Sequence, residues 1–179
     1  MIFALHEHPD GVRPMPGNRV VYDLGSGEAH FGAVRIDGHG LVWELSEYGG
    51  AGAKLAVEID PDRSLSWVLR CDRVDFPPGA VAYRHVHPGP GIRRLLTGRL
   101  TIEADDGART YGPGGAWFEG AGHAVVATAS PDEATAFVRV MLLPAEWAGK
   151  RTVRYLDPAD EAKPKLQRAT VLLEEPVHL

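Results

Sequence analysis

The chain has 179 residues, 44% of them hydrophobic and 24% charged, and its formal net charge is −5 at pH 7. This length supports one domain with its own core, and the negative charge argues against a general affinity for nucleic acid. No apolar run is long enough to cross a bilayer, residues 1–10 lack the basic region of a signal peptide, and Cys71 is the only cysteine, so we predict a cytoplasmic protein without a disulfide.

The first part of the chain predicts an irregular arm followed by strands. Residues 1–18 contain three prolines, which interrupt regular structure. His6 and His8 lie in this arm and are expected to be exposed to solvent. Alternating or apolar segments then predict strands at 19–24, 30–36, 41–48, 54–60 and 64–76.

From residue 80 onward the predicted strands become short and closely spaced. Most of them are bounded by Gly, Pro or Asp, which is typical of an all-β barrel or sandwich. Short helical turns are predicted at 144–150 and 158–164, and a last strand at 169–175. The closely spaced strands are expected at 80–87, 92–98, 99–106, 108–112, 116–119, 123–129 and 134–143.

A His-x-His pair ends one of these strands. Eight histidines in 179 residues give roughly 0.35 such pairs by chance, so the pair alone carries little information. Side chains two apart on a strand share a face, so Tyr83, His85 and His87 are expected to point the same way. Two imidazoles on one face can converge on a metal ion, and His123 opens a later strand after a glycine-rich loop.

These residues resemble the cupin superfamily. Its first motif, G-x5-H-x-H-x(3–4)-E-x6-G, matches this chain from Gly79 through His85 and His87 to Gly98. Its second motif, G-x5-P-x-G-x2-H-x3-N, is approximated by GGAWFEGAGH, which ends at His123. The resemblance covers about residues 65–145. It implies a jelly-roll (double-stranded β-helix) barrel with extra N-terminal strands, extending as a single cupin barrel over residues 19–179.

The resemblance also implies a divalent transition metal, Fe, Zn, Ni or Mn, held by His85, His87 and His123. The chain departs from the motifs at two points. Gly91 occupies the place of the usual glutamate, and the second motif is two residues short, so that strict register would put its histidine at Val125. The site is therefore expected either to be more electropositive and open than usual or to have decayed.

Three further residues are candidates for catalytic roles. Arg93 is expected to face the interior and bind an anionic ligand, or to face outward and pair with an acidic residue. Glu119 is a substitute ligand, a general base or an outward strand residue. Tyr83 is a hydrogen-bond donor to a substrate or an ordinary barrel-lining aromatic residue.

The resemblance favours a metalloenzyme acting on a small carboxylate, diketone or aromatic compound as a dioxygenase, isomerase or lyase. The alternative is a non-catalytic ligand- or metal-binding cupin with a degenerate site. The partners expected are an anionic small molecule and a second copy of the chain in a homodimer, because small cupins often exchange N-terminal strands or pack sheet faces.

Overall fold

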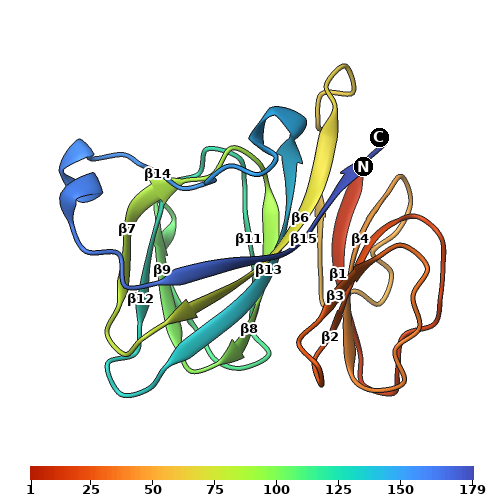
Figure 1. The fold of residues 1–179 in the computed structure, drawn as a ribbon, viewed down its shortest axis with the longest axis horizontal. Helices are drawn as coiled ribbons and strands as arrows, with labels where there is room; N and C mark the ends of the chain where they lie inside the picture. Colours follow the sequence, from red (N-terminus) through yellow and green to blue (C-terminus); the bar gives the residue numbers. More distant parts are fainter.

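The computed structural model describes all residues 1–179 as three antiparallel sheets of five strands each. Two of these sheets are the walls of a barrel, and the third lies beside it (Figure 1). The all-β class predicted from the sequence is confirmed. The only helices are two short 3-10 turns, η1 (Ala145–Trp147) and η2 (Pro158–Ala162), close to the two predicted positions. Neither of them is long and apolar enough to cross a bilayer.

The barrel walls have the strand orders β10-β9-β12-β7-β14 and β11-β8-β13-β6-β15. The chain alternates between the two walls from β6 to β9 and again from β10 to β15, which is a jelly-roll arrangement. The strands are β6 (Trp67–Phe76), β7 (Val81–Val86), β8 (Gly91–Thr97), β9 (Leu100–Ala104), β10 (Gly107–Tyr111), β11 (Ala116–Glu119), β12 (Val125–Ala129), β13 (Thr135–Pro144), β14 (Arg154–Tyr155) and β15 (Arg168–Val177).

The third sheet contains the N-terminal strands and corrects the expected irregular arm. Residues Ile2–His8 form β1, which pairs with two strands in the order β3-β2-β4-β1-β5. The prolines lie after this strand, and Phe3 and Leu5 are fully buried, so burial decides the structure here. The other strands are β2 (Asn18–Asp23), β3 (Ala29–Phe31), β4 (Gly40–Ser46) and β5 (Leu55–Glu58).

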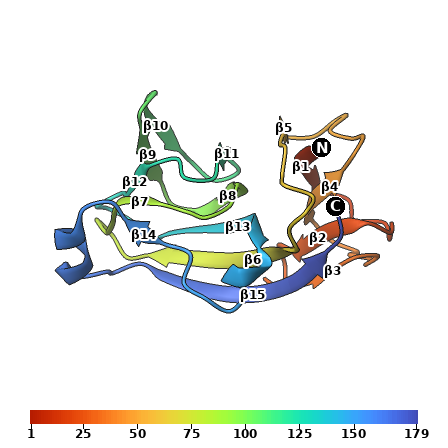
Figure 2. The ribbon, with the colours of Figure 1, turned by 90° about the horizontal axis from the view of Figure 1, so that it is seen from above.

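The N-terminal sheet covers the outer face of the β6-containing wall, as Figure 2 shows from above. Trp43 packs in one cluster with Leu69 and Ile92 and donates a hydrogen bond from Nε1 to the Ile92 carbonyl oxygen, 3.1 Å away. Cys71 is buried in the same cluster. The barrel wall is therefore buried on both faces, and only its inner face is available for a site.

Two glycines of the first motif allow the chain to turn immediately before β7 and immediately after β8. Gly79 and Gly98 have φ angles of 71° and 74°, in the left-handed region that favours glycine. At Gly98 a Cβ atom would also lie only 2.5 Å from the Ala134 carbonyl oxygen. The turns thus require glycine at both positions.

Candidate functional site

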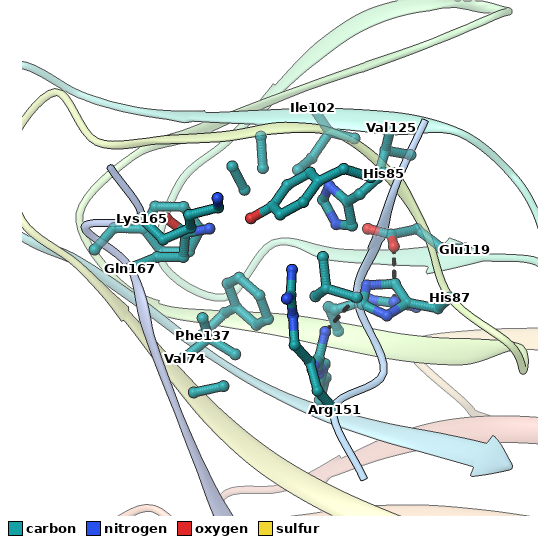
Figure 3. A pocket seen from close by; sticks show the side chains of 18 of the residues that line it. Val74, His85, His87, Ile102, Glu119, Val125, Phe137, Arg151, Lys165 and Gln167 are labelled. Carbon is teal, nitrogen blue, oxygen red and sulfur yellow. Dashed lines mark hydrogen bonds and ion pairs between the residues drawn. The ribbon is translucent and has the colours of Figure 1, made fainter. Parts of the chain in front are cut away.

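A cavity of about 500 Å³ lies inside the barrel, between the two walls (Figure 3). One part of its lining is apolar and includes Phe137 and Trp117, whose rings meet edge to face at 5.4 Å. The rest of its lining is ionisable and comes from both walls and from the segment around η2. The ionisable lining residues are His85, His87, Arg93, Glu119, Arg139, Arg151, Tyr155, Glu161 and Lys165.

A β-bulge in β7 decides which of its side chains enter the cavity. Val125 of β12 pairs with His85 and Ala127 pairs with Ala82, so β7 has one extra residue in this interval. Ala82 and His85 both line the cavity as a result. Tyr83 does not line it, and its ring packs against Tyr155 at 6.4 Å. The expected common face of Tyr83 with the two histidines is therefore wrong.

The histidines of the pair are both buried and have the same tautomer. Nδ1 of His85 lies 2.7 Å from the Tyr83 carbonyl oxygen, and Nδ1 of His87 lies 3.2 Å from the Thr152 carbonyl oxygen. A carbonyl oxygen only accepts hydrogen bonds, so Nδ1 carries the hydrogen in each ring and Nε2 carries the lone pair. Burial lowers the pKa of both imidazoles, which keeps them neutral at pH 7.

Nε2 of His87 already has a hydrogen-bond donor. Nη1 of Arg139 lies 3.2 Å from it, and Arg139 is itself held by Asp72, whose Oδ2 lies 2.8 Å from Nη2. The other oxygen of Asp72 accepts from Nε of Arg70 at 2.8 Å. These three charged side chains are buried and come from the middle of β6 and β13. They form a fixed ionic network under the histidine pair.

Arg93 faces the interior and pairs there with Glu119. Nη2 of Arg93 lies 2.7 Å from Oε2 of Glu119, whose Oε1 accepts a hydrogen bond from Trp117 at 2.8 Å. Burial lowers the pKa of Arg93 to about 10, so its guanidinium stays charged at pH 7. Nη1 donates to the Gly91 carbonyl oxygen at 2.6 Å. The outward positions considered for Arg93 and Glu119 are therefore wrong.

Gly91 leaves room for this arginine. A Cβ atom on Gly91 would lie 2.9 Å from Nη1 of Arg93 and 2.8 Å from Cγ of Met141. The guanidinium thus occupies space next to the position where the cupin motif has its glutamate. A side chain at position 91 would require Arg93 to move.

The lining of the inner end of the cavity contains more cations than carboxylates. Arg93 and Arg139 line it together with one carboxylate, Glu119. Behind this lining, Asp72 pairs with Arg70 and Arg139, and Nη1 of Arg70 also lies 3.7 Å from Oε2 of Glu174. The guanidiniums of Arg93 and Arg139 are therefore the cationic groups that an anion in the cavity could contact.

Several solved structures are similar to about half of this chain. An RmlC-like cupin from Shewanella frigidimarina is 18% identical over 44% of this chain and 68% of its own, with a TM-score of 0.40. The polyketide cyclase RemF from Streptomyces resistomycificus is 20% identical over 51% of this chain and 61% of its own, with a TM-score of 0.41. A cupin-superfamily sugar phosphate isomerase from Silicibacter pomeroyi is 21% identical over 50% of this chain and 57% of its own, with a TM-score of 0.39.

No protein-family model and no curated protein matches the sequence. The chain's own strand order agrees with the expected fold, because two antiparallel sheets enclose an interior site and the His85-x-His87 pair lies at the end of β7. The barrel has a cupin-type fold. The motif-bearing strands β6 to β13 span residues 67–144, close to the range of the family resemblance.

The expected third histidine does not join the pair. His123 is exposed, and its ring lies over Gly120, where a Cβ atom would approach within 2.8 Å of it. It lines a neighbouring pocket of about 580 Å³, which shares Glu119 and Val125 with the histidine cavity. The residue that faces His85 across the strand pair is Val125, which is buried. With the second motif two residues short, the histidine therefore lies outside the cavity that holds the pair.

The remaining side chains do not fit a metal ion as they are arranged. The lone pair of His87 is occupied by Arg139, and the cavity carboxylate nearest the pair, Glu119, is held by Arg93. Both neighbours are cations, which repel a divalent ion. No group of three or more His, Cys, Asp or Glu side chains is arranged to hold a metal. The donor set favours an anion in place of a metal ion.

Sequence reasoning missed the ionic network of this barrel and the segment around η2 that contributes to the cavity lining. The sequence places three charged residues inside otherwise apolar strands: Arg70, Asp72 and Arg139. Charged residues in such strands are rarely buried without partners, so their positions could have indicated a buried ionic network. Arg139 shares strand parity with Phe137, which indicates an inward direction. Lys165 lies in an irregular segment and had no signal in the sequence.

Proposed function

We propose that this cupin binds a small organic acid inside its barrel without a metal ion. The two guanidiniums that line the inner end of the cavity carry this proposal, since they are the cations that a ligand carboxylate could contact there. Arg93 and Arg139 both line the cavity, and an arginine guanidinium matches a carboxylate in shape and charge. The apolar lining around Phe137 and Trp117 would hold the hydrocarbon part of the acid.

We propose His85 as the group that exchanges a proton with this ligand. Its Nδ1–H is fixed by the Tyr83 carbonyl oxygen, so Nε2 is an unprotonated base in the cavity wall, without a protein donor. A neutral imidazole held in one tautomer is suited to general base catalysis. Proton removal from a bound acid begins many isomerase and lyase reactions, whereas a non-catalytic cupin would use the same binding contacts without turnover.

The experiment combines metal analysis with binding of benzoate, a small aromatic carboxylate. Protein without a polyhistidine tag is analysed for bound metals, and benzoate affinity is measured by calorimetry for the wild type and for Arg139→Met. We expect metal far below one ion per chain and about tenfold weaker binding in the variant. The matched control is Arg73→Met on the same wall, because Arg73 pairs with Asp75 outside the cavity.

Two outcomes would contradict the proposal. One is a metal ion bound at one per chain and lost in His87→Gln, because Arg139 would then have to leave Nε2 of His87. The other is benzoate binding that Arg139→Met leaves unchanged. Solvent deuterium incorporation into a bound acid, present in the wild type and absent in His85→Ala, would distinguish the enzyme from the non-catalytic protein.

We also propose the homodimer, for which the structure offers a different surface from the one expected. β1 pairs within its own chain, and the N-terminal sheet covers one barrel face, so neither is free for a second copy. β15 lies at the edge of its sheet and pairs only with β6. An unpaired edge is a template for another strand, and Val171 on it is exposed.

A further inference from the structure

A second charged cluster lies at the other end of the cavity. Arg151 and Glu161 form an ion pair with 3.2 Å between Nη2 and Oε1, and Nζ of Lys165 lies 3.8 Å from Oε2 of the same carboxylate. These residues belong to the segment before β14 and the segment around η2. Figure 3 shows Lys165 and Gln167 on the side of the cavity opposite to His87 and Glu119.

This outer cluster also has one positive charge in excess. Arg151 and Lys165 are two cations that share Glu161, and both lie over the Tyr155 ring, at 5.2 and 5.0 Å from its centre. The Lys165 side chain is only 25% exposed, so water screens its charge incompletely. The outer end of the cavity can therefore attract an anionic group of its own.

The space between the two ends is apolar. Val74, Ile102 and Phe137 line it, together with Val125. Figure 3 shows Phe137 between Lys165 on one side and His87 on the other, with Val125 beside His85. A ligand that fills the cavity would thus contact a cation at each end and hydrocarbon in its middle.

We propose that the ligand is a dicarboxylic acid with an apolar middle, bound at the inner end by Arg93 and Arg139 and at the outer end by Lys165. This inference rests on the proposed function for the inner carboxylate and adds the outer one. A dianion places one carboxylate beside the cations at each end, whereas a monocarboxylate leaves the cations of one end without a ligand anion. Lys165 is then a specificity-determining residue, since it selects a second anionic group.

The test compares acids that differ only in the second carboxylate. Terephthalate is matched with 4-methylbenzoate, and adipate with hexanoate, and all four affinities are measured by calorimetry at one ionic strength. We expect at least one dicarboxylate to bind about fivefold more tightly than its matched monoacid. In Lys165→Met this advantage should disappear, while the affinity for the monoacid stays the same.

Lys163→Met is the matched control, because Nζ of Lys163 lies over Tyr83 and pairs with Asp160 without lining the cavity. It should keep the preference for the dicarboxylate. Equal affinities within both pairs, or a preference that Lys165→Met does not change, would overturn the inference while leaving monoacid binding, and so the proposed function, in place. Failure of all four acids to bind would instead count against the proposed function.

Discussion

Arg139 contacts both an imidazole and a carboxylate, because it donates hydrogen bonds to Nε2 of His87 and to Oδ2 of Asp72. This position explains how the His-x-His pair can lie in a cavity without converging on a metal ion. A buried guanidinium takes the lone pair that a metal would need, and a buried carboxylate keeps the guanidinium in place. The chemistry of the pair is thus set by its neighbours as much as by the histidines.

Asp72 is expected to be essential for the stability of this network. It is fully buried and binds two arginines, so Asp72→Asn would leave both with weaker partners. Breaking a buried ion pair from one side costs about 3–5 kcal/mol, and urea denaturation would measure it. Asp75→Asn on the same strand is the control, with an expected cost of about 0.2–1 kcal/mol because Asp75 pairs with Arg73 near the surface. Equal costs for the two variants would contradict the network.

We expect the free energy of unfolding to decrease in mild acid because of His87. Burial lowers the pKa of His87 well below its usual value, and Arg139 and Arg93 act in the same direction. In the unfolded chain a histidine titrates near pH 6.5, so below this pH the unfolded state binds more protons than the folded state. Stability is therefore complete above about pH 6.5 and decreases as the pH falls.

Thermal unfolding at pH 7.5, 6.5 and 5.5 checks this dependence. For a chain of this size, each kcal/mol lost lowers the Tm by about 2–4 °C. His87→Gln should show a smaller decrease over this range than the wild type, because glutamine does not titrate. A decrease of the same size in both proteins would assign the dependence to other groups.

At the scale of elements, β1 is the strand whose role differs most from expectation. Leu5 on this strand is fully buried between the N-terminal sheet and the barrel. Leu5→Ala should therefore cost about 2–5 kcal/mol in urea denaturation, as a cavity in a packed core does. Met15→Ala is the control, because Met15 is 54% exposed and its replacement should change stability by no more than about 0.5 kcal/mol. A small cost for Leu5→Ala would mean that the first strand is not packed on the barrel.

Glu7 explains how the same strand is aligned with the barrel. Its Oε1 lies 2.7 Å from Nη2 of Arg94 on β8, and its Oε2 lies 3.1 Å from Nζ of Lys54. Leu5 and Glu7 share a face by strand alternation, so one face of β1 supplies both an apolar and an ionic contact to the barrel. Arg94 faces outward from the barrel, since it alternates with the inward Arg93, and is buried by the sheet that covers it.

At the scale of the whole molecule, the two ends of the chain meet at the N-terminal sheet. Val177 at the end of β15 packs in the same cluster as Leu5, and Asn18 donates a hydrogen bond to the His178 carbonyl oxygen at 2.8 Å. The N and C labels lie close together in Figures 1 and 2. The last strand thus connects the barrel wall to the sheet beside it.

The homodimer is checked at this scale by light scattering coupled to size-exclusion chromatography. We expect twice the mass of one chain, with contacts through the free edge of β15. Val171→Pro should shift the protein toward the monomer, because proline removes a backbone donor and fits poorly in a paired strand. A wild-type protein with the mass of one chain would contradict the dimer.

The sequence by itself determined the all-β class, most strands and the interior position of the His85-x-His87 pair. These features depend on local patterns: strand alternation, turn glycines such as Gly79 and Gly98, and the spacing of the first motif. It did not determine β1, since the prolines that follow this strand concealed it. Burial against a wall more than 60 residues away decided that strand.

Only the tertiary structure decided the chemistry of the site. One extra residue in β7 directed Tyr83 out of the cavity, and strand pairing placed Val125 opposite His85 in the position expected for a histidine. Arg139 and Asp72 lie 67 residues apart and meet only because β13 pairs with β6. Strand pairing and register follow from packing across the whole barrel, which no local pattern encodes. The sequence therefore predicted where the site lies, and the fold decided which side chains line it.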